Sequence, residues 1–243
     1  MKRFCDEQVI VFHRIVGAND DGIMAALHAW FPVLTDYEYE CGSLEEFLAH
    51  PLDEDVLSPL CLVAGFWNRP EQSPQERYPR LFSSEAGWRM TFLRDPFDVF
   101  VSFYAAHIRA SRMTSEEIPF QPFFLSNLNY IARSLRIETL GDLEAYKFIG
   151  ILTDPKASAA RLRCRLEALA DGSDDNPDFR RMTQQLGKPI PSVAPMSMSD
   201  WECEVRREIC AAQREEFERV NELDYAIWNE ALVRHDAEAS ALR

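Results

Sequence analysis

Four short segments of four or five residues, three of them apolar and the other carrying an arginine and a threonine, are the feature that most constrains the fold of this chain. Runs of this length, bounded by polar or glycine-containing segments, are typical of strands that are buried on both faces, as in parallel sheets. Helix-like segments separate the runs, and strands that alternate with helices indicate βαβ units. The pattern predicts an α/β fold with a central parallel sheet flanked by helices, in a single domain over residues 1–243. The predicted strands are Val9–Phe12, Leu60–Ala64, Arg89–Leu93 and Phe148–Leu152.

Helix start signals follow two of these strands and recur near the end of the chain. The Asp-Pro pairs at 95–96 and 154–155 place an N-cap aspartate before a proline at the first helical position, where a missing N–H is harmless. Residues 199–202 read as a capping box, which predicts one long terminal helix that ends near Leu232. The stretch 68–84 contains three prolines and is expected to be a surface loop.

The acidic charge balance restricts the partners of the protein. The chain has 40 Asp and Glu residues against 26 Lys and Arg residues, a formal net charge of −14, which repels nucleic acid and anionic membranes. No apolar run approaches the roughly 18–20 residues that span a bilayer, and no signal-peptide core is visible, so we expect a cytoplasmic protein. The six cysteines show no CxxC pair and no histidines at metal spacing, which favours reduced thiols and no metal site.

The strongest local signal lies where the third predicted strand meets the following helix. Arg94 stands at the strand end, on the carboxyl edge where open parallel sheets bind ligands. Ser102 lies seven residues beyond Asp95, about two helical turns, so its hydroxyl is expected on the same face as the helix start. A guanidinium and a hydroxyl that converge on one point favour a phosphate site. The alternative interpretation pairs Arg94 with a nearby carboxylate and leaves Ser102 without a role.

Residues 93–104, LRDPFDVFVSFY, resemble the 3′-phosphate-binding motif of sulfotransferases of the Golgi and bacterial carbohydrate type. This family uses 3′-phosphoadenosine 5′-phosphosulfate (PAPS). The resemblance implies a P-loop-NTPase-like sulfotransferase fold and assigns Arg94 and Ser102 to the 3′-phosphate. Tyr146–Thr153 is similar to the family's "phenylalanine-(valine or isoleucine)-glycine" strand, and Val220–Trp228 resembles its closing "N-x-x-D-x-x-(aromatic)" helix.

The loop after the first predicted strand departs from the family pattern. The family places a "K-T-(A or G)-G-T" loop there, whose backbone N–H groups and lysine hold the 5′-phosphosulfate, as a loop at a helix N-terminus can. In this chain Val16 stands in the place of the lysine, and Asp20 and Asp21 replace hydroxyl residues. By resemblance, the 5′-phosphosulfate is expected at Gly17, Ala18 and Asn19, with Arg14 as the replacement cation.

The residue expected to act as general base also departs from the family pattern. Relatives carry a histidine directly after the glycine that ends the second predicted strand, whereas this chain has Phe66. A base must come within about 3 Å of the proton that it removes. The histidines that remain are His13, at the end of the first strand, and His107, on the helix that carries Ser102. For His107 the alternative is a solvated helix residue, and for His13 a strand-end residue bonded to the backbone.

Taken with the resemblance, the motifs imply a PAPS-dependent sulfotransferase that needs no metal and transfers a sulfuryl group to a hydroxyl or amine of a carbohydrate or small-molecule acceptor. The alternative is a catalytically degenerate relative that binds nucleotide or a protein partner, which Val16 and Phe66 favour. Neither a G-x-x-x-x-G-K-[ST] loop nor a G-x-G-x-x-G motif occurs, which argues against a kinase, an ATPase or a dinucleotide enzyme. The acceptor site is expected near the aromatic stretch Phe120–Phe124 and the loop 68–84.

Overall fold

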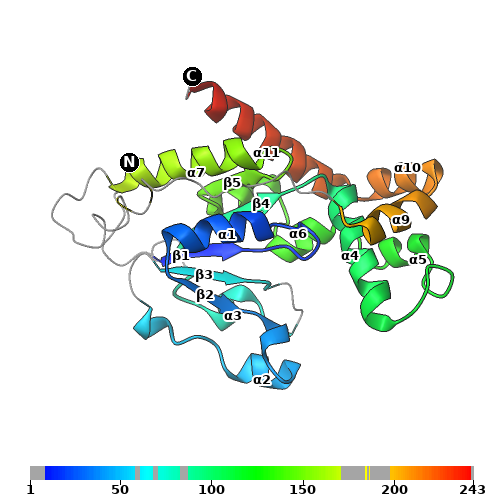
Figure 1. Ribbon diagram of the computed structural model, residues 1–243, viewed down its shortest axis with the longest axis horizontal. Helices are drawn as coiled ribbons and strands as arrows, with labels where there is room; N and C mark the ends of the chain where they lie inside the picture. The colour runs from blue at the N-terminus through cyan, green and yellow to red at the C-terminus, as the bar shows by residue number, and fades with distance from the viewer. Residues whose placement is uncertain are drawn as a thin grey trace.

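Five parallel strands form the central sheet in the computed structural model of the protein (Figure 1). Their order across the sheet is β2-β3-β1-β4-β5, so the predicted α/β class with a parallel sheet flanked by helices is confirmed. The strands are β1 Val9–His13, β2 Val33–Asp36, β3 Leu62–Gly65, β4 Gly87–Leu93 and β5 Phe148–Ile151. The structure describes residues 9–57, 61–67, 71–82, 87–170, 184, 186 and 198–241.

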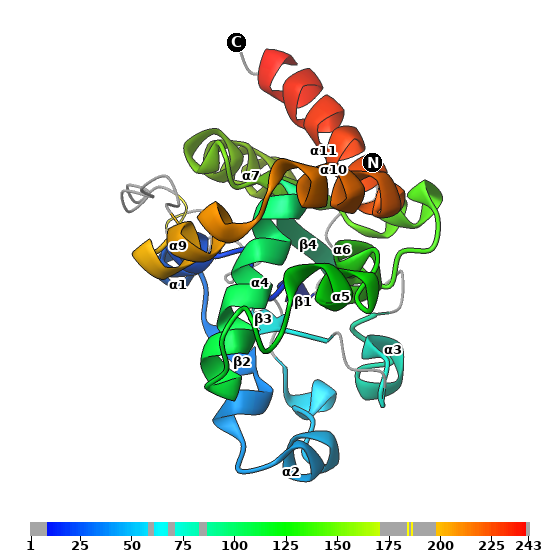
Figure 2. The ribbon, with the colours of Figure 1, turned by 90° about the vertical axis from the view of Figure 1, so that its right-hand side faces the viewer.

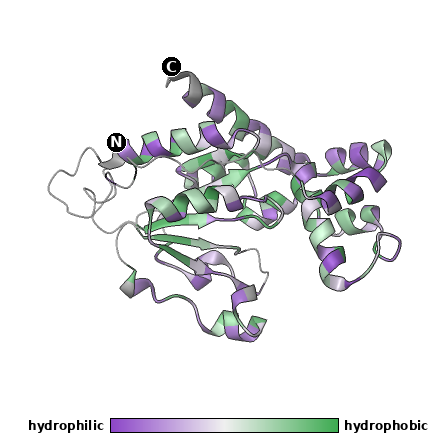
Figure 3. Ribbon diagram, in the orientation of Figure 1, coloured by the Kyte–Doolittle hydropathy of each residue, from purple (hydrophilic) through white to green (hydrophobic). Residues whose placement is uncertain are grey.

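The sheet is buried on both faces, as the apolar runs predicted. On β1, the side chains of Ile10 and Phe12 belong to the main core, which also contains residues of the helices that flank the sheet. The alternate residues Val9 and Val11 belong to a second apolar cluster, with Phe82, on the other face. Because successive side chains of a strand point to opposite faces, β1 contributes to two cores. Figure 3 shows the strands as predominantly hydrophobic and the helices as mixed.

Ten α-helices and three 3₁₀ turns are found among the described residues. Helices α4, α5, α9 and α10 gather beyond one end of the sheet, on the right of Figure 1, and Figure 2 views the molecule from this end. No helix within the described ranges is long and apolar enough to cross a membrane. The helices are α1 Asp21–Trp30, α2 Leu44–Ala49, α3 Pro74–Arg77, α4 Pro96–Ser111, α5 Phe120–Leu125, α6 Tyr130–Leu135, α7 Pro155–Ala170, α9 Asp200–Glu208, α10 Ala211–Val220 and α11 Glu222–Ala241, and the turns are η1 Glu38–Glu40, η2 Glu54–Val56 and η3 Leu140–Ala145.

The predicted helix starts are present. Oδ1 of Asp95 accepts hydrogen bonds from the N–H groups of Phe97 and Asp98, at 3.0 and 3.2 Å, and Pro96 is the first residue of α4. Before α7, Oδ1 of Asp154 accepts from the N–H of Ala157 at 3.1 Å. The capping box at 199–202 opens α9. Side-chain caps supply partners for N–H groups that the first turn of a helix leaves unpaired.

Two predictions about the elements are wrong. The terminal segment is not one long helix, because extended backbone at Ile209 and Cys210 separates α9 from α10, and Asn221 separates α10 from α11. The side chain of Asn221 donates to the carbonyl of Phe217 at 2.8 Å, which favours a break at this position. The stretch 68–84, expected to be a surface loop, contains helix α3, and its Tyr78 is fully buried.

Candidate functional site

The carboxyl edge of the sheet between β1 and β4 is the place where the chain's connections diverge. From β1 the chain runs through α1 to β2, toward one edge of the sheet, and from β4 it runs through α4 to β5, at the opposite edge. Open α/β sheets bind ligands in the crevice outside such a switch point. Arg14, which follows β1, and Arg94, which follows β4, both lie at this edge. The topology therefore brings the two predicted cation positions to neighbouring strands.

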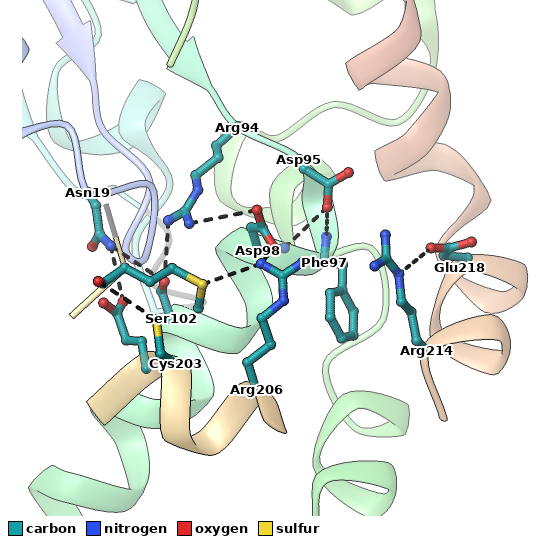
Figure 4. A network of polar contacts seen from close by, with 12 residues as sticks. Asn19, Arg94, Asp95, Phe97, Asp98, Ser102, Cys203, Arg206, Arg214 and Glu218 are labelled. Atoms are coloured by element: carbon teal, nitrogen blue, oxygen red, sulfur yellow. Dashed lines mark hydrogen bonds and ion pairs between the residues drawn. The ribbon is translucent and has the colours of Figure 1, made fainter. Parts of the chain in front are cut away.

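Arg94 and Ser102 meet at the start of α4 (Figure 4). Both side chains are buried, and a guanidinium nitrogen of Arg94, Nη1, lies 3.5 Å from the Ser102 hydroxyl oxygen. The other, Nη2, lies 3.7 Å from Oδ2 of Asp98, which also forms an ion pair at 2.7 Å with Arg206 of α9. The structure thus brings together the two residues of the predicted phosphate site, and it also supplies the carboxylate that the alternative interpretation requires.

A carboxylate from α9 enters the same cluster. Oε1 of Glu202 accepts a hydrogen bond from the side-chain amide of Asn19 at 3.0 Å, and this amide also lies 3.4 Å from the Ser102 hydroxyl. Burial by itself would raise the pKa of Glu202, but hydrogen bonds with Ser102, Asn19 and Ser199 hold it below its usual value. The sequence pattern identifies Glu202 only as a capping residue. Its contact with Asn19 joins residues 183 positions apart, which no local pattern signals.

The loop between β1 and α1 is held tightly against α4. Gly17 has φ +88°, and a Cβ atom at this position would lie 2.5 Å from the carbonyl oxygen of Val99 and 2.9 Å from the nitrogen of Phe103. Asn19 also adopts the left-handed region, with φ +58°. Only glycine fits a position that combines positive φ with such a close backbone approach. The predicted loop residues Gly17 and Asn19 therefore lie directly beside the helix that carries Ser102.

Several N–H groups of this loop have no hydrogen-bond partner among the residues that the structure describes. The N–H of Arg14 donates to the carbonyl of Gly65 at 2.9 Å, and that of Ala18 donates to the carbonyl of Ile15 at 3.1 Å. The N–H groups of Val16, Gly17 and Asn19 form no hydrogen bond within the described part of the chain. Unpaired N–H groups in a loop that leads into a helix are suited to bind an anion. Ala18, in contrast, is fully buried and its N–H is already paired.

Arg14 does not reach into the cluster around Arg94 and Ser102. Its Nε donates to Oδ1 of Asp20 at 2.9 Å, and its terminal nitrogens contact Asp20, Asp21 and the Tyr37 hydroxyl. Burial alone would lower the pKa of Arg14, but the charge and hydrogen bonds of Asp20 raise it. The guanidinium also lies 4.8 Å from the centre of the Phe66 ring. Arg14 is thus neutralised within its own loop, and the expectation that it replaces the missing lysine finds no support in this arrangement.

His13 is sealed beneath the sheet edge. Its ring is 1% exposed, Nδ1 is hydrogen-bonded to the Tyr146 hydroxyl at 2.7 Å, and the rings of Trp67 and Phe82 pack against it. Burial, together with the charge of Arg89, lowers the pKa of His13 to about 3. A base must reach the proton of an acceptor, and this ring has no exposed approach. The structure therefore argues against the predicted catalytic role; the residue is a buried strand-end residue, as in the alternative, but Nδ1 is bonded to the side chain of Tyr146 and not to the backbone.

His107 lies on the outside of α4. Its side chain is exposed and its ring contacts Phe123, with ring centres 5.0 Å apart. Five residues correspond to about 500° of helix rotation, so His107 points roughly 140° away from Ser102. The structure does not bring the two residues together. The predicted base role of His107 is not supported by this placement, which matches the alternative of a solvated helix residue.

Two residues of the closing motif at 220–228 form hydrogen bonds with the start of α6. The carboxylate oxygens of Asp224 accept hydrogen bonds from the N–H groups of Ile131 and Ala132, at 3.0 and 2.8 Å. Oδ1 of Asn221 accepts from the N–H of Asn129 at 2.6 Å. These contacts cap the N-terminal end of α6 from α11. The spacing of Asn221 and Asp224 in the motif is thus explained by two caps on one short helix.

A search of the described residues finds no group of three or more His, Cys, Asp or Glu side chains arranged to hold a metal ion. The chain matches no protein-family model, and no curated protein is similar to it in sequence. The geometry at the carboxyl edge therefore carries the functional argument. Its essential parts are a buried arginine and serine, a neighbouring loop with unpaired N–H groups, and a carboxylate from α9 among them.

Proposed function

We propose that this protein is a PAPS-dependent sulfotransferase, which binds PAPS at the carboxyl edge between β1 and β4 and transfers its sulfuryl group to a hydroxyl or amine of a carbohydrate or small-molecule acceptor. The observation that carries the proposal is the convergence of Arg94, Ser102 and Asn19, from three separate elements, on one buried point. The strand order and the resemblance of residues 93–104 to the family's phosphate motif support it.

Three residues at this point can donate hydrogen bonds to the 3′-phosphate of PAPS, and one carboxylate repels it. Arg94, Ser102 and Asn19 supply a guanidinium, a hydroxyl and an amide, all of which donate hydrogen bonds to phosphate oxygens. Glu202 brings a carboxylate to the same point, so its side chain must turn away when a phosphate binds. Glu202 is only partly buried, but its second oxygen, Oε2, accepts hydrogen bonds from the N–H and hydroxyl of Ser199, so this movement also opens the capping box of α9.

The loop 15–19 is the proposed place of the 5′-phosphosulfate. Its unpaired N–H groups at Val16, Gly17 and Asn19 are oriented by a backbone that α4 holds in place. Bound PAPS supplies the sulfuryl group and a nucleotide leaving group, and fixed N–H donors stabilise charge that develops on such a leaving group. The proposal assigns no histidine as general base, because His13 is sealed and His107 points away.

A second function is favoured by the state of Arg14. Its ion pair with Asp20, together with Val16 in the place of the expected lysine, leaves the loop without a cation for the transferring group. The loss of one transition-state charge donor typically costs on the order of 100- to 1000-fold in rate. The second candidate is therefore a protein that binds the nucleotide through Arg94 and Ser102 and does not transfer sulfate.

Two experiments test both candidate functions. The first is calorimetric titration with adenosine 3′,5′-bisphosphate, and the second is a transfer assay with labelled PAPS and a panel of hydroxyl and amine acceptors. We expect micromolar binding by the wild type and an affinity about 10- to 150-fold lower for Arg94→Ala, the effect of one charge-assisted contact. Arg109→Ala, which removes an exposed arginine of the helix that carries Ser102, is the matched control. Binding with label transfer supports the first function, and binding without transfer supports the second. A folded protein that does not bind the nucleotide contradicts both.

A further inference from the structure

A cavity of about 300 Å³ lies away from the carboxyl edge, between β4, the end of α6 and the turn η3. Arg89 of β4 pairs in register with Val11 of β1, so its side chain points to the same face of the sheet as Val11 and the Phe82 cluster. None of the residues that line the cavity belongs to the site around Arg94. The lining residues are Gln75, Arg89, Leu135, Arg136, Ile137, Gly141, Asp142, Ala145 and Tyr146.

Arg89 is the unusual member of this lining. It is partly buried, and its Nε is buried without a hydrogen-bond partner. Its guanidinium carbon lies 5.7 and 6.0 Å from the ring centres of Phe82 and Tyr146, and no carboxylate among the described residues forms an ion pair with it. Burial without a compensating charge lowers the pKa of Arg89. A buried arginine is ordinarily paired, because an uncompensated charge in the interior is strongly destabilising.

The acidic residue of the lining does not neutralise this charge. Oδ2 of Asp142 accepts hydrogen bonds from the N–H groups of Glu138 and Thr139, at 2.9 and 2.8 Å, and lies 3.2 Å from the Thr139 hydroxyl. These bonds hold the pKa of Asp142 below its usual value and direct its carboxylate to the start of η3. Gln75 brings an amide to the cavity wall, and Arg136, which also lines it, lies close enough to Glu76 to help lower the pKa of that carboxyl. The lining therefore presents donors and positive charge.

We propose that this cavity is a second ligand site, which binds a small oxyanion, such as an organic acid or a phosphate, through the guanidinium of Arg89. The planar fork of arginine matches the oxygen geometry of carboxylates and phosphates. The cavity volume stands at the lower end of the range of ligand pockets, which limits the ligand to a small molecule. The site is independent of PAPS binding, since its residues lie on other elements than the loop 15–19 and the start of α4.

Titration calorimetry with acetate and with inorganic phosphate tests the proposal, and the two probes distinguish a carboxylate from a phosphate ligand. The experiment uses the Arg94→Ala variant as its background, which weakens oxyanion binding at the proposed 3′-phosphate site, and the dependence of the signal on Arg89 separates binding in the cavity from binding at the loop 15–19. We expect saturable binding of at least one probe, and an affinity about 10- to 150-fold lower when Arg89→Met is added. Adding Arg109→Met, at an exposed position of α4, is expected to leave the affinity unchanged.

Thermal unfolding in the absence of anions supplies a second readout. Arg89→Met removes a partly buried cation that forms no ion pair with a described residue, so its melting temperature is expected to rise rather than fall. Arg89→Lys, which keeps the charge but loses the fork, serves if the methionine variant does not fold, and it is expected to bind acetate more weakly than Arg89 does. The proposal is overturned if the folded protein shows no saturable binding of either probe, or if the affinity is the same with and without Arg89. Both outcomes are independent of whether the nucleotide binds at the carboxyl edge.

Discussion

Arg14 and Arg94 occupy corresponding positions on neighbouring strands and have different environments. Each directly follows the last residue of a central strand, and their side chains are 8% and 6% exposed. Arg14 is bonded to Asp20, Asp21 and Tyr37 by contacts of normal hydrogen-bond length, whereas Arg94 has Ser102 at 3.5 Å and Asp98 at 3.7 Å. Position and burial are therefore the same, and the partners differ. A guanidinium whose three nitrogens all donate to protein groups stabilises the fold, and one with long contacts remains available to a ligand.

The Asp20→Ala substitution gives the largest expected effect. It leaves Arg14 buried without its principal counter-charge, which is expected to lower the free energy of unfolding by about 3–5 kcal/mol. Urea denaturation followed by fluorescence measures this change. Asp21→Ala is the matched control, because the Asp21 side chain is 87% exposed and its ion pair with Arg14 is expected to contribute under about 1 kcal/mol. An equal loss of unfolding free energy in the two variants would contradict the larger contribution expected of the buried ion pair between Arg14 and Asp20.

Measuring both stability and nucleotide affinity for a variant of each arginine sharpens the comparison between Arg14 and Arg94. Arg94→Ala is expected to lower the affinity for adenosine 3′,5′-bisphosphate by about 1.5–3 kcal/mol, with a smaller loss of stability than Asp20→Ala. Arg14→Ala is expected to do the reverse, because it removes a fold-stabilising partner of Asp20 and no donor of the proposed phosphate site. Denaturation and calorimetry on both variants give four values. A loss of affinity that is larger for Arg14→Ala would reverse the assignment of the two arginines.

Asp224 extends the comparison to a buried acid whose hydrogen bonds come from backbone N–H groups. Burial raises the pKa of Asp224 to about 6, although those N–H groups oppose the shift. The folded state then holds the proton more tightly than the unfolded state, so this group's contribution to stability is lost as pH rises through about 6. Between pH 7.5 and pH 5 the wild type should gain about 1.4 kcal/mol relative to Asp224→Asn. Denaturation at both pH values measures the difference, and parallel pH profiles would contradict it.

The smallest expected effect comes from Glu202. Glu202→Gln keeps the capping box of α9 and removes the carboxylate beside Ser102, so the affinity for adenosine 3′,5′-bisphosphate is expected to rise by about three- to tenfold. Calorimetry on the variant measures the gain. Glu204→Gln, at an exposed position of the same helix, is the control and is expected to change nothing. An unchanged affinity in Glu202→Gln would place the phosphate elsewhere.

The parts of the fold that were predictable from the sequence are those set by neighbouring residues. The apolar runs of β1, β3, β4 and β5 and the caps of α4 and α7 are local signals, and all are present. Strand β2, Val33–Asp36, was missed, because it is short and contains polar residues, and its pairing with β3 is a tertiary effect. The break between α10 and α11 was missed as well, because only one of the two bonds of the Asn221 side chain, that to Phe217, is local, and the other, to Asn129, spans 92 positions.

In the candidate site, too, the contacts between residues close in sequence were predictable, and the contacts between distant residues were not. Arg94 and Ser102 lie eight residues apart across a strand end and one helix, so their approach follows from regular geometry. The two aspartates of the loop were visible in the sequence, but the direction in which Arg14 points depends on Tyr37 and Phe66, from elsewhere in the chain. Glu202 could not be placed, because α9 reaches the loop only through the packing of the terminal helices.

The close approach of Gly17 to α4 has a consequence for how this loop can evolve. The two nearest contacts are backbone atoms, the carbonyl oxygen of Val99 and the nitrogen of Phe103. Side-chain substitutions on α4 cannot remove backbone atoms, so no second mutation on that helix can compensate for a larger residue at position 17. Val16, the preceding residue, is partly buried and packs against the main core. The backbone course of the loop at position 17 is therefore constrained by α4, whatever side chains surround it.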